Sequence, residues 1–230
     1  MLGPSEGHHL VDVLRLGPGD LVVVFDGEGR EATARIVSAG GNDRGVVLAE
    51  EETLATDQST TEVILVVALP KGKRMDVVVE KGTEMGVSAI WPVLTDRVVA
   101  RPDAVRSRQR AERWRRIAQS AAKQCCRARV PDVREPAPLA DVLPEAAACD
   151  LLLVGSLAAD AVPLRQAVAG RRAGSPRTVA MLIGPEGDLT EVELQSALEA
   201  GAVPVSFGST TLRVETAALF ACAVLVYEFS

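Results

Sequence analysis

Short continuous runs of hydrophobic residues alternate with helical patterns over the larger, C-terminal part of the chain. Runs of strand length that are apolar on both sides are typical of a parallel sheet covered by helices on both faces. The expected strands are Val63–Leu69, Ala89–Leu94, Leu151–Val154, Val179–Ile183 and Val203–Phe207. The expected helices are Arg74–Met85, Ser107–Cys125 and Val162–Val168, then one after Thr190 and a last apolar helix near the C-terminus. The pattern predicts an α/β domain.

The first sixty residues have a different pattern. A short helix is expected from His8 to Leu16, closed by Gly17-Pro18-Gly19. Short β-branched segments separated by Gly, Asp and Asn turns follow, and they favour a small antiparallel barrel. The expected strands are Asp20–Asp26, Glu31–Ser38 and Gly45–Glu50. The polar segment Glu51–Thr61 is interpreted as a linker, which gives two domains, residues 1–60 and 61–230.

The segment Val179–Ala217 contains the clearest local signals. A glycine turn, Gly184–Gly187, follows a buried strand, and its glycines are expected to permit positive φ and a close approach of backbone to a ligand. Thr190 and Glu193 fit a capping box for the next helix, and Gly201 fits its C-terminal stop. Open α/β sheets bind ligands at the carboxyl ends of their strands, where this turn lies.

A second polar loop, Gly208–Ala217, precedes the last helix. Arg213 and Glu215 are expected just before that helix, where backbone N–H groups and the Thr216 hydroxyl are available to a polar ligand. The alternative is that Glu215 and Thr216 only cap the helix and Arg213 forms a surface ion pair.

Several common motifs are absent. There is no GxGxxG after an early strand, no GxxxxGK[ST] and no GxSxG, which argues against an ordinary dinucleotide site, a P-loop and a hydrolase nucleophile elbow. The proline-rich segment Pro131–Pro144 is interpreted as a surface connection.

Charge is unevenly distributed. The formal net charge is −6, yet Arg97–Arg134 holds twelve basic and three acidic residues, a local excess of nine positive charges. Such a field on an acidic protein favours a polyanionic partner on one face. The alternative is a solvated helix that happens to be rich in arginine.

The composition of the chain indicates a folded protein without a membrane span or a metal site. At 47% hydrophobic and 24% charged residues, the chain is expected to fold, and no apolar run is long enough to span a membrane. The N-terminus lacks the features of a signal peptide, so a cytoplasmic location is expected. The cysteines have no CxxC spacing and only two histidines occur, so no metal site is expected and the thiols are expected to be free and buried or half-buried.

Four motifs in order resemble one family. HHLVDVLRLGPGD with VFDGEG resembles an N-terminal PUA-like RNA-binding barrel. LPKGKRMDVVVEKGTEMGVSAIWPVLTDRVV, RWRRIAQSAAKQCCRARVPDV and the pair IGPEG and LRVETA resemble the catalytic domain of SPOUT-class RNA methyltransferases of the RsmE type. Together they extend over nearly the whole chain.

The resemblance implies a specific function. Such enzymes use S-adenosyl-L-methionine to methylate N3 of a uridine in 16S ribosomal RNA, and the substrate here is expected within the small ribosomal subunit. It also implies a homodimer and a trefoil-knotted C-terminal domain after the barrel. Two alternatives remain open: a ribose 2′-O-methyltransferase on the same fold, and a non-catalytic RNA-binding module.

Given this function, individual residues are assigned roles by their chemistry and charge. Arg213 and Glu215 are the expected catalytic pair. The expected cofactor-binding residues are Val154, Gly155, Ile183, Gly184, Pro185, Glu186, Gly187, Phe207, Gly208, Leu212, Thr216 and Ala217. The expected RNA-binding residues are Arg15, Lys71, Lys73, Arg74, Arg113, Arg116 and Arg127.

The chain departs from the family pattern in two places. It begins close to the His8-His9 helix, so the barrel either lacks a first strand or closes differently. Asp188 and Leu189 stand where Gly and Phe are usual, and Thr210 stands where a basic residue is common.

Overall fold

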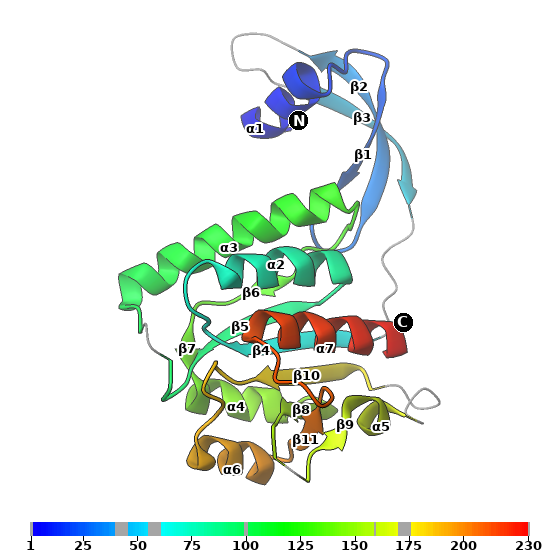
Figure 1. The fold of residues 1–230 in the computed structure, drawn as a ribbon. Helices are drawn as coiled ribbons and strands as arrows, with labels where there is room; N and C mark the ends of the chain where they lie inside the picture. Colours follow the sequence, from blue (N-terminus) through cyan, green and yellow to red (C-terminus); the bar gives the residue numbers. More distant parts are fainter. Residues whose placement is uncertain are drawn as a thin grey trace. The chain divides into compact units, whose positions relative to one another are not determined.

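The computed structural model describes residues 2–39, 46–54, 61–98, 101–158, 160–169 and 176–229. The chain divides into two compact units, Met1–Gln58 and Ser59–Ser230 (Figure 1). Each unit has its own sheet.

The first unit is a three-stranded antiparallel sheet preceded by a short helical segment. The helical elements are α1 (Pro4–His8) and a π-helical turn, η1 (His9–Val13). The strands are β1 (Leu21–Phe25), β2 (Glu31–Ala39) and β3 (Val46–Leu54), in the order β1-β2-β3. The antiparallel sheet was predicted correctly. Among the described residues no pairing between β1 and β3 closes it into a barrel.

Two boundaries of this unit were predicted wrongly. The helix was expected from His8 to Leu16, but it starts at Pro4, whose fixed φ suits a first helical turn, and Arg15 takes a left-handed φ of 58° after it ends. The segment Glu51–Thr61 is also not all linker, because β3 continues to Leu54 by pairing its backbone with β2. The remaining residues 55–60 lie outside the described residues.

The second unit is built on an eight-stranded sheet in which every pairing is parallel, as predicted. The strand order is β6-β5-β4-β10-β8-β11-β9, and β7 pairs with β5. The strands are β4 (Glu62–Ala68), β5 (Ala89–Leu94), β6 (Asp132–Val133), β7 (Ala137–Pro138), β8 (Leu151–Gly155), β9 (Val162–Pro163), β10 (Thr178–Ile183) and β11 (Val203–Ser206). Burial of β4, β8 and β10 on both sides explains their unbroken apolar sequences.

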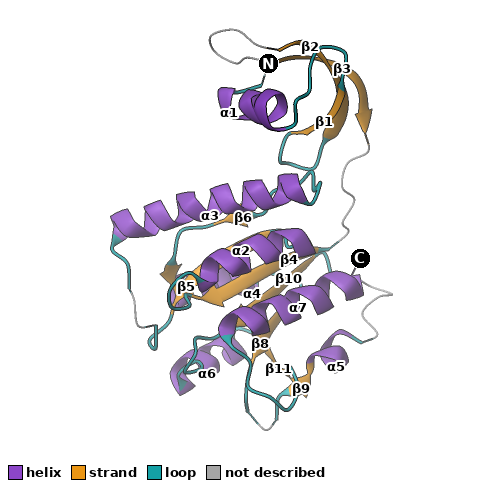
Figure 2. Cartoon of the chain, turned by 45° about the horizontal axis from the view of Figure 1, so that its top comes forward, coloured by secondary structure: helices purple, strands orange, loops and turns teal. Residues whose placement is uncertain are grey.

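Helices cover both faces of this sheet. They are α2 (Arg74–Met85), α3 (Ala104–Gln124), α4 (Leu139–Ala147), α5 (Leu164–Val168), α6 (Glu191–Glu199) and α7 (Val214–Phe229). Figure 1 and Figure 2 show α2, α3 and α7 on one side of the sheet, with α4 and α6 on the other. None of the described helices is both long and apolar enough to cross a membrane.

The helix after the glycine turn has the predicted boundaries. The Thr190 hydroxyl accepts a hydrogen bond from the Glu193 N–H at 3.2 Å, and the Glu193 carboxylate accepts one from the Thr190 N–H at 2.8 Å. Gly201 follows α6 with a φ of 92°, a conformation that favours glycine. The capping box and the C-terminal stop are confirmed.

Proline-rich and short segments were harder to predict. Pro131–Pro144 is not a plain surface connection, because it contains β6, β7 and the start of α4. The expected helix Val162–Val168 begins only at Leu164, since Val162–Pro163 pairs with β11 as β9.

All four cysteines are free thiols, but Cys126 is exposed rather than buried or half-buried. It follows α3 in a left-handed conformation with a φ of 56°, which turns the chain out of the helix. Cys222 is buried in α7, and burial raises the pKa of its thiol to about 12. The protonated thiol is a poor nucleophile at neutral pH, which excludes Cys222 as an activated catalytic cysteine.

Candidate active site

Three loops meet at the carboxyl ends of neighbouring parallel strands. β10 lies next to β8 and β8 lies next to β11, so the segments that follow these strands emerge at one edge of the sheet. They line one pocket together with the start of α7. The lining residues are Gly155, Ser156, Leu157, Ile183, Gly184, Pro185, Glu186, Asp188, Ser206, Phe207, Gly208, Thr210, Thr211, Leu212, Val214 and Ala217.

The glycine turn owes its shape to a neighbouring residue. Gly184 and Gly187 were expected to adopt positive φ, but neither does, and Asp188 takes the left-handed conformation instead with a φ of 64°. Gly184 is needed for space, because a Cβ there would lie 3.2 Å from the Leu189 backbone nitrogen. Asp188 therefore supplies the bend of the turn, and it also lines the pocket.

Arg97 holds the same turn from outside. Its guanidinium donates to the carbonyl oxygens of Gly187 and Leu189, the latter at 3.2 Å. A Cβ on Gly187 would lie 3.4 Å from Arg97 Cδ, so Gly187 is packed against Arg97 and does not line the pocket. The neighbouring Asp96 N–H donates to Glu193 at 2.8 Å, which ties the segment after β5 to the start of α6.

The apolar part of the pocket depends on Phe207. A Cβ added to Gly155 would lie 3.0 Å from the Phe207 ring, so only glycine lets β8 and the ring come this close. The ring packs edge-on against Phe220 of α7, with the centroids 5.8 Å apart. Ile183 and Ala217 complete this apolar surface.

A charged cluster joins the pocket to the loop after β4. Arg74, the first residue of α2, donates to Glu186 with an Nη1–Oε1 distance of 3.0 Å, and its Nε lies 3.6 Å from Glu215 Oε1. The Lys71 backbone N–H also points to Glu186 Oε1, at 3.4 Å. Residues from three distant parts of the sequence thus meet here.

The predicted catalytic pair lies at the start of α7. Glu215 was expected just before the helix, but α7 begins at Val214, so Glu215 is in the first turn, where a carboxylate interacts favourably with the helix dipole. Its side chain is 17% exposed, and its Oε2 is buried without a hydrogen-bond partner among the described residues. Arg213 is exposed, and within the described parts of the chain its guanidinium has no partner. A buried acceptor and an available cation are therefore two residues apart.

Most of the predicted cofactor-binding residues line the pocket. Those that do are Gly155, Ile183, Gly184, Pro185, Glu186, Phe207, Gly208, Leu212 and Ala217. Val154 does not, because it is fully buried within β8, and Gly187 and Thr216 also lie off the lining. The residues missed are Ser156, Leu157, Asp188, Ser206, Thr210, Thr211 and Val214. All are within two positions of a predicted residue, so extending each loop by one or two residues would have found them.

The predicted RNA-binding residues are not one group. Lys71, Lys73 and Arg116 are exposed, as is Arg15 in the first unit. Arg74 pairs with two glutamates of the site, and Arg113 pairs with Asp76 of α2. These contacts engage the two side chains within the protein.

Arg127 has a structural role that sequence reasoning missed. Its guanidinium donates to the carbonyl oxygens of Thr83, Gly86 and Val87, at 3.2, 2.9 and 2.7 Å. These groups lie at the C-terminal end of α2, where carbonyls lack partners within the helix. Arg127 therefore caps α2, and its donors face inward.

Replacing Arg127 by alanine should destabilise the fold by about 2 kcal/mol, because it removes charge-assisted hydrogen bonds to partly buried carbonyls. The affinity for RNA should change less than about twofold. Urea unfolding and RNA titration measure the two effects. The control is Arg116→Ala, which should change stability by less than about 0.5 kcal/mol because Arg116 is exposed on α3. A loss of RNA affinity in a stable Arg127→Ala protein would contradict the capping role.

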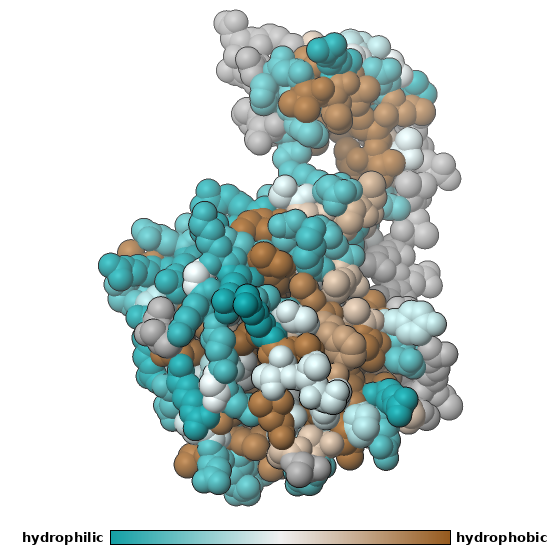
Figure 3. Space-filling view, viewed as in Figure 1, coloured by the Kyte–Doolittle hydropathy of each residue, from teal (hydrophilic) through white to brown (hydrophobic). Residues whose placement is uncertain are grey.

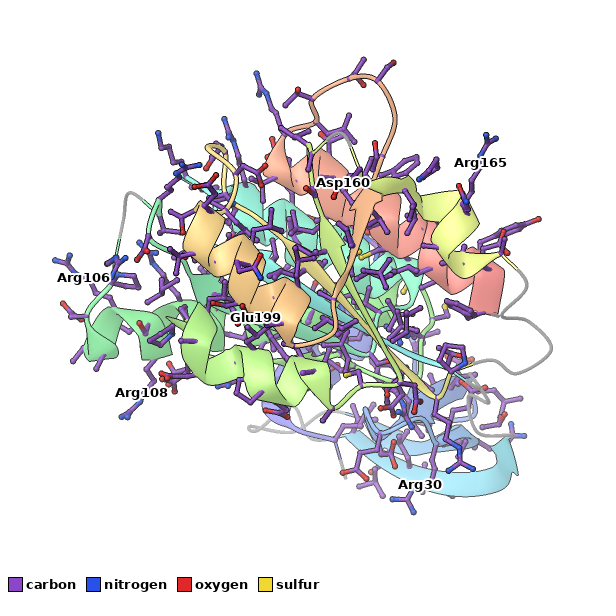
Figure 4. The ribbon with its side chains drawn as sticks, turned by 90° about the horizontal axis from the view of Figure 1, so that it is seen from below. Arg30, Arg106, Arg108, Asp160, Arg165 and Glu199 are labelled. Atoms are coloured by element: carbon purple, nitrogen blue, oxygen red, sulfur yellow. The ribbon has the colours of Figure 1, made fainter. Side chains whose placement is uncertain are left out.

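The outer face of α3 carries a basic surface. Arg106 and Arg108 project away from the body of the unit (Figure 4), and their guanidinium groups approach Asp103 and Glu135 at 3.7 and 3.8 Å. Such exposed pairs are weak and easily exchanged for other anions. Figure 3 shows a mainly hydrophilic surface over α3 and a hydrophobic area over α7.

No group of three or more His, Cys, Asp or Glu side chains among the described residues is placed to hold a metal ion.

Two family models match the chain. The model described as RNA methyltransferase domain matches residues 57–226, and the model described as RNA methyltransferase PUA domain matches residues 2–46. Among curated proteins, the ribosomal RNA small subunit methyltransferase E of Bacillus subtilis is 31% identical over 97% of this chain and 88% of its own length. The protein of the same name from Mycobacterium bovis is 36% identical over 94% of this chain and 82% of its own length.

Solved structures agree with these matches. The putative methyltransferase Lpg2936 of Legionella pneumophila, in complex with S-adenosylmethionine, superposes with a TM-score of 0.84 at 31% identity, over 97% of this chain and 89% of that one. The ribosomal RNA small subunit methyltransferase E of Neisseria gonorrhoeae, bound to S-adenosyl methionine, gives 0.80 at 30% identity, over the same shares of the two chains.

Proposed function

The chain belongs to the ribosomal RNA small subunit methyltransferase E family, and we propose that it methylates N3 of one uridine in 16S ribosomal RNA. It is a methyltransferase of small-subunit ribosomal RNA that uses S-adenosylmethionine. The observation that supports the N3 position is the Glu215 carboxylate, whose Oε2 has no hydrogen-bond partner among the described residues. Glu215 is two positions from the exposed Arg213, and Val214 between them lines the pocket.

The pocket suits S-adenosylmethionine. It combines an apolar surface around Phe207 with polar residues of the three loops, among them Ser156, Asp188 and Thr211. The absence of a side chain at Gly155 lets the Phe207 ring, which also lines the pocket, pack against the end of β8. Ligand pockets of this kind join apolar walls to a few placed polar groups. The residues that line the pocket are proposed to bind the cofactor.

The chemistry requires removal of a proton. When bound, S-adenosylmethionine supplies an electrophilic methyl group on its sulfonium sulfur. N3 of uracil carries a hydrogen at neutral pH, so the ring nitrogen becomes a good nucleophile only as that proton leaves. We assign the proton to Glu215 Oε2, an acceptor with no other partner among the described residues. The N3 electron pair then forms the bond to the methyl carbon as the carbon–sulfur bond breaks.

Arg213 is assigned the second role. Negative charge spreads onto O2 and O4 of the base as N3 loses its proton. An arginine beside one of these oxygens stabilises that charge, and the exposed Arg213 guanidinium is available to do so. In this proposal Glu215 accepts the proton and Arg213 stabilises the anion of the base.

RNA is proposed to bind along the exposed basic residues. Lys71 and Lys73 lie in the loop beside Glu186, and Arg116 lies on α3. Lysine and arginine contacts to phosphates position RNA without reading its sequence. The target uridine must be unstacked to reach the pocket. The first unit, with Arg15, is proposed as a PUA-like RNA-binding domain.

Three further proposals follow from the family. The C-terminal domain is proposed to be a trefoil knot, and the protein to act in the cytoplasm. It is also proposed to form a homodimer through the apolar face of α7 and α2, where Phe220, Tyr227 and Val77 are 43%, 74% and 43% exposed.

The substrate is tested with a labelled methyl donor. Small ribosomal subunits that lack the modification, protein-free 16S RNA and large subunits are each incubated with the enzyme. Label should enter small-subunit RNA and not large-subunit RNA. Label in the large subunit alone, or in no RNA although S-adenosylmethionine binds, would contradict the proposal, and the second result would favour a non-catalytic binding module.

A further inference from the structure

One side chain connects three loops of the active site. Arg74 stands at the start of α2, directly after the loop that follows β4. It contacts Glu186 of the glycine turn at 3.0 Å and Glu215 of α7 at 3.6 Å. Its partners are 112 and 141 positions away in the sequence, so the contacts depend on the fold of the whole unit.

The neighbouring lysines differ from Arg74. Lys71 and Lys73 are exposed, and neither side chain has a partner among the described residues, whereas Arg74 is 35% exposed and paired twice. An arginine can serve two carboxylates at once because its planar guanidinium carries several donors in fixed directions. Arg74 therefore has a different role from Lys71 and Lys73, although all three lie within four residues of the sequence.

We propose that Arg74 is a positioning residue that fixes Glu186 and Glu215 in the arrangement required for S-adenosylmethionine binding and methyl transfer, and is not an RNA phosphate contact. This inference depends on the proposed function. Glu186 lines the pocket, so holding its carboxylate from outside fixes one pocket wall. The contact with Glu215 Oε1 leaves Oε2 as the acceptor that the reaction requires.

Loss of Arg74 should weaken cofactor binding because the loops that it contacts become less ordered, and not because one positive charge is removed. Loops that must arrange themselves on binding reduce affinity, and contacts that arrange them beforehand restore it. Without Arg74 the glycine turn and the start of α7 lose a common partner. Cofactor affinity should therefore fall even when no RNA is present.

The test is calorimetric titration of S-adenosylmethionine into Arg74→Ala, Lys73→Ala and the wild-type protein, all without RNA. Arg74→Ala should weaken binding about fivefold to tenfold. Lys73→Ala removes the same charge one residue away and should leave the affinity within about twofold. The salt dependence of binding to 16S RNA is then measured for the same proteins. The slope of log affinity against log salt concentration should decrease in magnitude by about 0.7 for Lys73→Ala and stay unchanged for Arg74→Ala.

Two further variants separate positioning from folding. Glu186→Gln should weaken S-adenosylmethionine binding to a similar degree. Its combination with Arg74→Ala should lose little more, because both changes disrupt the same Arg74–Glu186 contact. Arg74→Lys should recover part of the lost affinity. Urea unfolding should show similar stability for all variants.

The outcomes are distinct. If wild-type protein fails to bind S-adenosylmethionine, the proposed function fails. If wild-type protein binds and methylates but Arg74→Ala binds with unchanged affinity, only this inference fails. Equal losses in Arg74→Ala and Lys73→Ala, or additive losses in the double variant, would also overturn it.

Discussion

Replacing Glu215 by glutamine is expected to slow methyl transfer at least about a hundredfold, the usual range for loss of a general base. Glutamine keeps the size of the side chain but its amide does not accept the N3 proton. The affinity for S-adenosylmethionine should stay within about threefold, because Glu215 is not among the pocket-lining residues. Single-turnover rates with labelled donor and small subunits, together with calorimetry, measure the two effects.

The matched control for this result is Glu191→Gln. Glu191 is also a glutamate in the first turn of a helix, but it is exposed on α6. Its replacement should leave the transfer rate within about twofold. A Glu215→Gln enzyme with an undiminished rate would show that another group accepts the proton.

Replacing Gly208 by alanine is expected to weaken S-adenosylmethionine binding about tenfold or more. Gly208 lines the pocket with a φ of 119°, which alanine adopts only with strain of about 1–3 kcal/mol. A Cβ there would meet nothing within 4 Å, so the effect comes from the backbone and not from a clash. The loop is expected to relax to another conformation and lose its backbone contacts with the cofactor. Calorimetric titration measures the change in affinity.

Gly201→Ala provides the control. Gly201 has a φ of 92°, and a Cβ there would also meet nothing within 4 Å, but it lies after α6 and away from the pocket lining. Its replacement should lower the free energy of unfolding by about 1 kcal/mol without changing cofactor affinity. Equal affinities of Gly208→Ala and wild type would show that this loop does not hold the cofactor.

The elements predicted correctly are those whose sequence pattern lies within a short stretch of the chain. β4, β5 and β10 were found because central parallel strands are buried on both faces and read as continuous apolar runs. The α6 capping box was found because its two residues are three apart. β6, β7 and β9 are two residues long, too short for any periodicity. Prolines within or beside β6 and β7 suggested a surface connection, and β9 was included in the expected helix Val162–Val168.

The site was predictable in its loops but not in its contacts. The glycine turn and the second loop were located, because parallel strands bring the loops after their carboxyl ends together. The left-handed residue proved to be Asp188 and not a glycine of the turn, since Asp tolerates that conformation. Arg74 and Arg127 were interpreted by their charge alone. Their partners lie far away in the sequence, so no local pattern distinguishes a cation that caps or positions from one that binds phosphate.

The position of the transferred methyl group separates N3 methylation of uridine from methylation of the ribose. RNA methylated by the enzyme with labelled donor is digested to nucleosides, and the labelled nucleoside is identified by chromatography and mass spectrometry. The expected labelled product is N3-methyluridine, formed by the wild-type enzyme and strongly reduced with Glu215→Gln. Recovery of the label as a 2′-O-methyl nucleoside, with none as N3-methyluridine, would contradict it.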